Sequence, residues 1–271
     1  METINSQPFI VKEAIGEKVP LIISIPHCGI AFPSEIVGDY LPEQVKSVDD
    51  TDWFLEELYN FATAMGITVV QAKYSRWVID LNRDPESAPL YNDGRIITGL
   101  TTTTDFLGNP IYKEGCEPNK AEVDRRLATY YWPYYKQVSQ LLNDRISEFG
   151  NAVLWDAHSI RESVPTIRTE KFPEMILGNA DQTSAHPNLI NAALSELRKG
   201  YQVNHNDPFK GGHITRYFGN PSKNIHALQL ERNKNLYMDD AERLFDEDRA
   251  EAMRKILKST LSQLIDVVKS L

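Results

Sequence analysis

The sequence has little cysteine, a deficit of basic residues and no long apolar run. Its only cysteines are Cys28 and Cys116, so a disulfide framework is not expected and we predict a reducing compartment, the cytoplasm. Acidic residues outnumber basic ones by 38 to 29, and the formal net charge of -9 argues against broad binding to nucleic acids or anionic membranes. A local basic pocket for a small anion is compatible with this charge.

Membrane spans and targeting signals are also missing. No run approaches the roughly 18 apolar residues that a membrane-spanning helix needs, and the first residues lack the basic start and apolar segment of a signal peptide. No repeat, low-complexity tract or flexible linker divides the chain. With 41% hydrophobic and 25% charged residues, the composition is typical of a soluble globular protein. We therefore expect a single domain over residues 1–271.

Apolar runs alternate with helical periodicities, which predicts an α/β fold whose mostly parallel, mixed sheet is flanked by helices. The predicted strands cover residues 19–25, 67–71, 76–81, 153–155, 174–177 and 225–230. The predicted helices cover residues 54–65, 120–149 (kinked or divided at Pro133), 187–199 and 239–271. Residues 86–118, rich in Gly, Pro, Asn and Thr, are predicted to form a functional loop over a site.

Polar side chains follow several of these strands, at the sheet edge where open α/β folds bind their ligands. Four strand ends carry them: His27, Asn82 with Arg83, Asp156 with His158, and Glu231. Asp156 and His158 are two residues apart, so an extended chain places them on one face. One such histidine is more often structural, but the repetition at four strand ends favours a site.

Three acids precede the helix predicted after Trp53: Asp49, Asp50 and Asp52. Acids at a helix start are expected from capping and from the helix dipole. That account does not need all three, so Asp52 is a candidate to complete a metal site.

This set of residues contains the parts of a mononuclear zinc hydrolase. Two histidines and a carboxylate can hold the metal, a separate glutamate can move the proton of the attacking water, and an arginine can stabilise the oxyanion or anchor a substrate carboxylate. A competing hypothesis is a cysteine hydrolase in which Cys28 is the nucleophile and His27 or His158 is the base.

Six segments carry a resemblance to a known family: PHCG, DDTDW, SRWVIDLNR, LWDAHSIR, KGGHITRYFG and HALQLE. From about residue 8 to residue 240 the sequence resembles the N-formylglutamate amidohydrolase (N-formylglutamate deformylase) family. That family is similar in layout to zinc carboxypeptidases and aspartoacylase-like deacylases. The resemblance implies a carboxypeptidase-like α/β architecture and one divalent metal ion, Zn²⁺.

The resemblance also implies roles for individual residues. It implies His27 and His158 as zinc ligands, Glu231 as general base, Arg76 as a candidate to stabilise the oxyanion, and Asp156 as a carboxylate behind the metal ligands. Asn82 and Arg83 would hold a substrate carboxylate.

One position departs from the carboxypeptidase pattern. That pattern has a Glu three residues after the first His, whereas position 30 here is Ile. The carboxylate ligand must therefore come from elsewhere, and our choice is Asp52, with Asp50, Asp49 and Glu35 as the alternatives. His213 and Arg216 have no counterpart in that layout and are predicted only as substrate contacts.

The activity implied by the resemblance is the cleavage of N-formyl-L-glutamate, a small anionic N-acyl amino acid, to formate and L-glutamate. In the family this is the last step of one route of histidine degradation. The enzymatic alternative is another N-acyl amino acid deacylase, of the N-acylaspartate or succinylglutamate type. A non-catalytic amino-acid-binding relative is the other alternative. The sequence leaves the native metal and the oligomeric state open.

Overall fold

The fold is built on a mixed β-sheet. The computed structural model describes residues 7–86 and 99–271, and in these ranges seven strands form one sheet with the order β1-β3-β2-β4-β7-β5-β6. The strands are β1 (Phe9–Lys12), β2 (Leu21–Ile25), β3 (Thr68–Ala72), β4 (Ala152–Ala157), β5 (Met175–Gly178), β6 (Val203–His205) and β7 (Ile225–Arg232). The central strands β3, β2, β4 and β7 are parallel, whereas β1 and β5 pair antiparallel with β3 and β7. The predicted α/β class with a mixed sheet is confirmed.

The strand register aligns the ends of the central strands. Asp156 on β4 lies beside Ser24 on β2 and Gln229 on β7. Since these strands run in the same direction, their carboxyl ends meet at one edge of the sheet. The residues that follow β2 and β4 and those that end β7 are therefore brought together.

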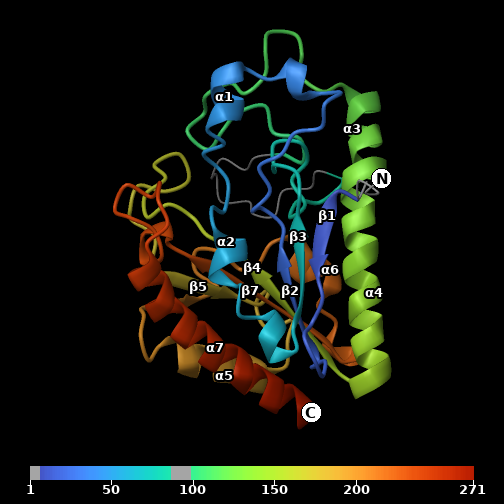
Figure 1. Cartoon of the computed structure of the whole chain (residues 1–271), viewed down its shortest axis with the longest axis vertical. Helices are drawn as coiled ribbons and strands as arrows, with labels where there is room; N and C mark the ends of the chain where they lie inside the picture. The colour runs from blue at the N-terminus through green and yellow to red at the C-terminus, as the bar shows by residue number, and fades with distance from the viewer. Residues whose placement is uncertain (1–6, 87–98) are drawn as a thin grey trace.

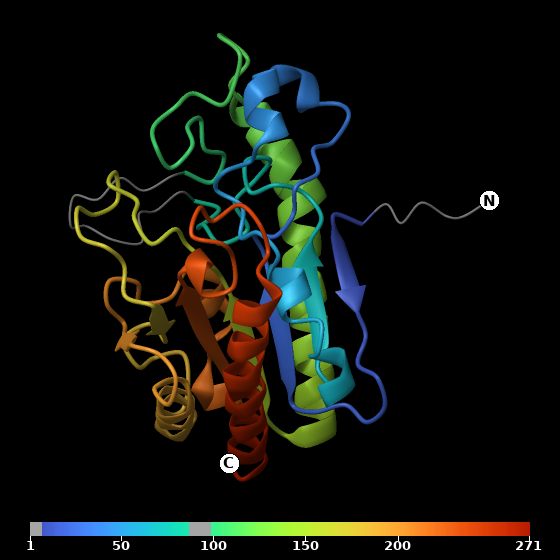
Figure 2. The same ribbon diagram turned by 60° about the vertical axis from the view of Figure 1, so that its left-hand side comes forward.

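Helices cover both faces of the sheet (Figures 1 and 2). They are α1 (Pro42–Lys46), α2 (Leu55–Leu58), α3 (Lys120–Arg126), α4 (Trp132–Phe149), α5 (Pro187–Leu197), α6 (His213–Phe218) and α7 (Glu247–Lys269). The long helix α4 lies on one side, while α5 and α7 pack together on the other (Figure 1). Within the described ranges, no helix combines the length and apolarity that a bilayer span requires.

Side chains of the central strands β3, β2, β4 and β7 alternate between two cores. Ile22 and Leu154 pack in the cluster that contains Tyr134 and Val138 of α4. Their neighbours in sequence, such as Trp155, pack in the cluster that contains residues of α5 and α7. Because both faces of the sheet are covered, the strands read as continuous apolar runs in the sequence.

The strand predicted over residues 76–81 is wrong. These residues form consecutive turns, beginning with a hydrogen bond from the Val78 amide to the Ser75 carbonyl. Side chains from elsewhere pair with the backbone of this segment in place of a strand ladder: the Tyr40 hydroxyl donates to the Trp77 carbonyl at 2.9 Å. The segment is buried and apolar, which is why its sequence resembles a core strand.

Other boundaries also differ from the prediction. The helix predicted over residues 54–65 is shorter than expected: α2 begins at Leu55, because Phe54 before it has a left-handed backbone with φ of 60°, and ends at Leu58. A separate 3₁₀ turn follows at Thr63–Met65. The last helix begins at Glu247 rather than at 239, with Asp246 as its N-cap. Strands β1 and β6 and helix α6 were not predicted. Of the loop predicted over residues 86–118, residues 87–98 lie outside the described ranges, and residues 99–118 contain no helix or strand.

The division predicted at Pro133 is confirmed in an unexpected form. A π-helical turn, Leu127–Tyr131, joins α3 to α4 directly before this proline. The last residue of the turn, Tyr131, and Tyr135 of α4 both direct their hydroxyls to the 81–83 segment. Tyr131 donates to the carbonyl of Arg83 and Tyr135 to the carbonyl of Leu81, both at 2.8 Å. The helix thereby fixes the backbone on which Asn82 and Arg83 sit.

Replacing Tyr135 by Phe should lower the free energy of unfolding by about 1–3 kcal/mol, because the Leu81 carbonyl loses its buried donor. Urea denaturation of Tyr135→Phe measures this change. Tyr217→Phe is the matched control, since Tyr217 contacts the Tyr135 ring but is 52% exposed. Equal stability of the two variants would contradict the role assigned to the Tyr135 hydroxyl.

Candidate active site

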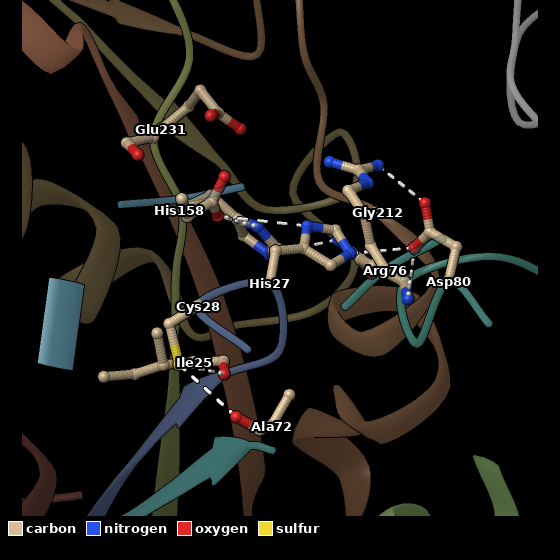
Figure 3. Close-up of polar contacts among 12 residues, drawn as sticks. Ile25, His27, Cys28, Ala72, Arg76, Asp80, His158, Gly212 and Glu231 are labelled. Carbon is tan, nitrogen blue, oxygen red and sulfur yellow. Dashed lines mark hydrogen bonds and ion pairs between the residues drawn. The ribbon is translucent and has the colours of Figure 1, made fainter. Parts of the chain in front are cut away.

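Three predicted metal ligands converge in the structure. His27 follows β2, His158 follows β4, and Asp52 precedes α2. Asp52 Oδ2 lies 3.2 Å from His158 Nδ1 and 3.8 Å from His27 Nδ1. One ligand atom from each residue lies within 4.8 Å of the others, and all three residues are buried. Figure 3 shows the two imidazoles side by side, with Glu231 next to His158.

A second carboxylate supports each histidine on its other nitrogen. His27 Nε2 lies 2.8 Å from Asp80 Oδ1, and His158 Nε2 lies 3.0 Å from Asp156 Oδ2. Because an ionised carboxylate only accepts, each ring keeps a hydrogen on Nε2. Each ring can then offer the Nδ1 lone pair, on the side of Asp52, to a metal ion that takes the place of an Nδ1 proton. Metal-binding histidines are oriented in this way in proteins.

The electrostatics of the group favour a bound cation. Burial and the charge of Arg76 lower the pKa of His27 to about 4, so this ring is neutral at pH 7. Burial alone would lower the pKa of His158, but Asp156 and Asp52 outweigh it and raise that pKa well above its usual range. The position between Asp52 and His158 thus attracts positive charge.

The remaining carboxylate candidates have other partners. Asp50 accepts hydrogen bonds from Trp77 Nε1 and from the Phe106 amide. Asp49 pairs with Arg161, and Glu35 accepts from the Tyr130 hydroxyl at 2.6 Å. Of the four carboxylates considered, Asp52 is the one that contacts the histidines. Two imidazole nitrogens and a carboxylate oxygen are a donor set that suits Zn²⁺, so the residues present fit the expected metal.

Glu231 lies near the end of β7, facing the same group. Burial raises its pKa to about 7, and the charge of Asp52 acts in the same direction. The one described hydrogen bond of its side chain is donated by Gln229 Nε2 to Glu231 Oε2, at 3.4 Å. A carboxyl group that titrates near neutrality suits a general base.

Arg76 and Arg83 both lie next to Asp80. Arg76 Nη2 is 2.6 Å from Asp80 Oδ2, and the Arg76 guanidinium lies 4.7 Å from the centre of the Phe106 ring. Arg83 Nε is 3.8 Å from the same Asp80 oxygen. Asp80 therefore joins both predicted arginines to His27. Figure 3 shows its contacts with His27 and Arg76.

Asn82, predicted to contact the substrate, is almost fully buried, with 4% of its surface exposed. Its Oδ1 accepts from the Ile214 amide at 2.8 Å, and its Nδ2 lies 3.1 Å from His158 Nε2 and 3.4 Å from Gln229 Oε1. The backbone of Gly212 lies close to this residue: a Cβ on Gly212 would lie 2.2–2.5 Å from the Asn82 amide group. To contact a ligand directly, the Asn82 side chain would have to give up its hydrogen bonds with Ile214 and Gln229.

His213 and Arg216 lie on α6, which begins beside Asn82. The His213 ring is half-buried against Tyr135 and Tyr217, and Arg216 is exposed, with Nε donating to the Gly211 carbonyl. Their described contacts place them near the 82–83 segment rather than at the His27–Asp52–His158 group.

The surroundings of Cys28 disfavour the cysteine hydrolase. Its thiol donates to the carbonyls of Ile25 and Ala72 (Figure 3). Burial raises the pKa of the Cys28 thiol well above its usual range. The nucleophilic thiolate is therefore not the favoured form.

Sequence reasoning missed two polar residues of the site and one that supports it. Asp80 was assigned to the interior of a strand that does not exist. Ser24 donates to Asp156 at 3.0 Å from within an apolar run. Gln229 could have been found, because it lies two residues before Glu231 and a strand places both on one face.

Comparison with known proteins identifies relatives of this chain. A sequence profile of the family described as N-formylglutamate amidohydrolase matches residues 19–238. The N-formylglutamate deformylases of Pseudomonas putida and Pseudomonas aeruginosa are 41% and 40% identical over 251 residues, which cover 92% of this chain and 93% of each relative.

A solved structure extends the similarity to the fold. The crystal structure of the N-formylglutamate amidohydrolase from Ralstonia eutropha JMP134 superposes with a TM-score of 0.77 at 26% identity, over 97% of both chains. The profile match covers most of the sequence, including His27, Asp52, His158 and Glu231. The chain belongs to the N-formylglutamate amidohydrolase family.

Proposed function

We propose that this protein is a metal-dependent amidohydrolase that cleaves N-formyl-L-glutamate to formate and L-glutamate. The observation that carries the proposal is the convergence of His27, Asp52 and His158, each histidine supported by a carboxylate, beside a glutamate whose pKa is about 7. The names of the relatives at about 40% identity support the same substrate. The place of this reaction in histidine degradation stays a prediction.

His27, Asp52 and His158 would hold a divalent cation, which we propose to be Zn²⁺. When bound, such a cation supplies a Lewis acid that polarises the formyl carbonyl and acidifies the attacking water. Glu231 accepts the proton of that water and passes it to the leaving nitrogen, which departs as the amine of L-glutamate. A raised pKa suits both steps, because the same group must take up and release a proton near neutral pH.

The substrate carries two carboxylates and develops a negative oxygen in the transition state. We propose that Arg76 stabilises this oxyanion, since Asp80 and the Phe106 ring hold its guanidinium in place. Arg83 is the proposed partner of a substrate carboxylate, together with His213 and Arg216 on α6. Asn82 has this role only if the substrate displaces its present partners.

Replacing His158 by Ala should abolish both metal retention and formate release, because the ligand set loses an imidazole. Metal content by mass spectrometry and formate release from N-formylglutamate are measured on the same preparation. His186→Ala is the control histidine, since His186 caps α5. Full activity in a metal-free wild-type preparation would overturn the mechanism.

Replacing Glu231 by Gln should leave the metal content near that of the wild type and reduce turnover by about 10²- to 10⁴-fold, the usual contribution of a general base. Steady-state kinetics with the metal-loaded variant measure this loss. Turnover within a few-fold of the wild type would show that Glu231 is not the base.

The proposed function differs from that of the related deacylases in the acyl group that is removed from the substrate. A pocket that takes formyl should reject larger groups, so N-formylglutamate should be hydrolysed at least about tenfold faster than N-acetylglutamate or N-succinylglutamate. The values of kcat/KM for these compounds and for N-acetylaspartate decide the point. Preference for an acetyl or succinyl substrate would indicate the other deacylase class, and binding without hydrolysis would indicate a non-catalytic relative.

A further inference from the structure

We propose that Gln229 is a positioning residue. It fixes the Glu231 carboxylate relative to the backbone of the 211–216 segment. The inference rests on the proposed function, in which Glu231 is the base. Gln229 lies on β7 two residues before Glu231, is 5% exposed, and contacts the Gly212 amide, Asn82 and Glu231. It touches none of the proposed metal ligands in these contacts, so it acts through its neighbours.

The orientation of the Gln229 amide follows from a backbone group. The Gly212 amide lies 2.7 Å from Gln229 Oε1, and a backbone N–H can only donate. The oxygen of the side chain must therefore face Gly212. Its NH₂ group must then face Glu231 Oε2, at 3.4 Å. Gln229 thus presents a donor to the carboxylate of the base.

The Asn82 amide is oriented by the same argument. The Ile214 amide donates to Asn82 Oδ1 at 2.8 Å, which leaves Nδ2 to face Gln229 Oε1 and His158 Nε2. In the metal-binding form of His158, Nε2 carries a hydrogen that is directed to Asp156. The free hydrogen of Asn82 therefore goes to Gln229. Donation runs in one direction, from Asn82 to Gln229 to Glu231.

This chain of amides links the two halves of the proposed site. Asn82 and Gly212 belong to the segments that carry Arg83, His213 and Arg216, the proposed substrate contacts. Glu231 moves the proton of the attacking water. Through Gln229, the position of the base depends on the same backbone that positions the substrate. A flip of the Gln229 amide would turn its NH₂ group towards the Gly212 N–H, so two donors would face each other. The contact with Gly212 therefore keeps the NH₂ group of Gln229 on the side of Glu231.

The test compares Gln229→Glu and Gln229→Met in the metal-loaded enzyme. The glutamate keeps an acceptor for Gly212 but turns a like charge towards Glu231, and the methionine removes both polar atoms. We expect kcat to fall about 10- to 100-fold in both variants, with KM changed less than about threefold. The acidic limb of the kcat/KM profile should move to higher pH, because a base that has lost its donor is protonated more easily.

Gln71 provides the matched control. It is a glutamine of the same sheet, on β3, with 8% exposure and an Oε1 that has no hydrogen-bond partner. Gln71→Glu and Gln71→Met should leave the pH profile unmoved, whatever they cost in thermal stability. If Gln229→Met does not fold, the nearly isosteric Gln229→Glu decides.

Two results would overturn the inference: a folded Gln229→Glu enzyme whose kcat and acidic limb match the wild type, or the same shift in the Gln71 variants. Failure of the proposed function is distinguishable from both. In that case the wild-type enzyme releases no formate, or Glu231→Gln retains turnover, before any Gln229 variant is compared.

Discussion

The carboxylate of Asp80 is the group on which the arrangement of the site depends. It contacts His27 Nε2, Arg76 and the backbone amide of Asn82, at 2.6–2.9 Å. Burial alone would raise the pKa of Asp80, but the charges of Arg76 and Arg83 and the contact with His27 hold it well below its usual range. A buried carboxylate with this many donors is stable as an anion. One residue thus sets the tautomer of a proposed ligand and the place of both arginines.

The turns around Asp80 are held from outside the sheet. Arg126 Nη1 donates to the Val78 carbonyl at 3.0 Å and to the hydroxyls of Tyr40 and Tyr112. Tyr131 and Tyr135 pair with the carbonyls on either side of Asn82. Irregular backbone can be buried only when such partners are present. Strands β2 and β7 lead to His27 and Glu231, whereas this non-strand segment supplies Arg76, Asp80 and Asn82.

The sequence predicted the elements with strong local signals. His27, His158 and Glu231 were found because apolar strands end in polar side chains, and Asp52 because its helix did not need another acid. The 76–81 segment was misassigned because a buried turn and a buried strand have the same apolar composition, and only long-range partners such as Tyr40 distinguish them. Asp80 was not assigned to the site because its contact with His27, 53 residues away in the chain, has no local signal in the sequence.

The π turn at Leu127–Tyr131 restricts where residues can be inserted into or deleted from this helix. Each residue advances an α-helix by about 100°, so removing one residue from the turn would rotate α4 relative to α3 by roughly that angle. Tyr131 and Tyr135, stacked at 4.3 Å between ring centres, would then face away from the 81–83 carbonyls. Insertions and deletions should therefore be tolerated at the ends of the helix and not at this turn, which makes chain length in residues 127–131 a constraint on the site.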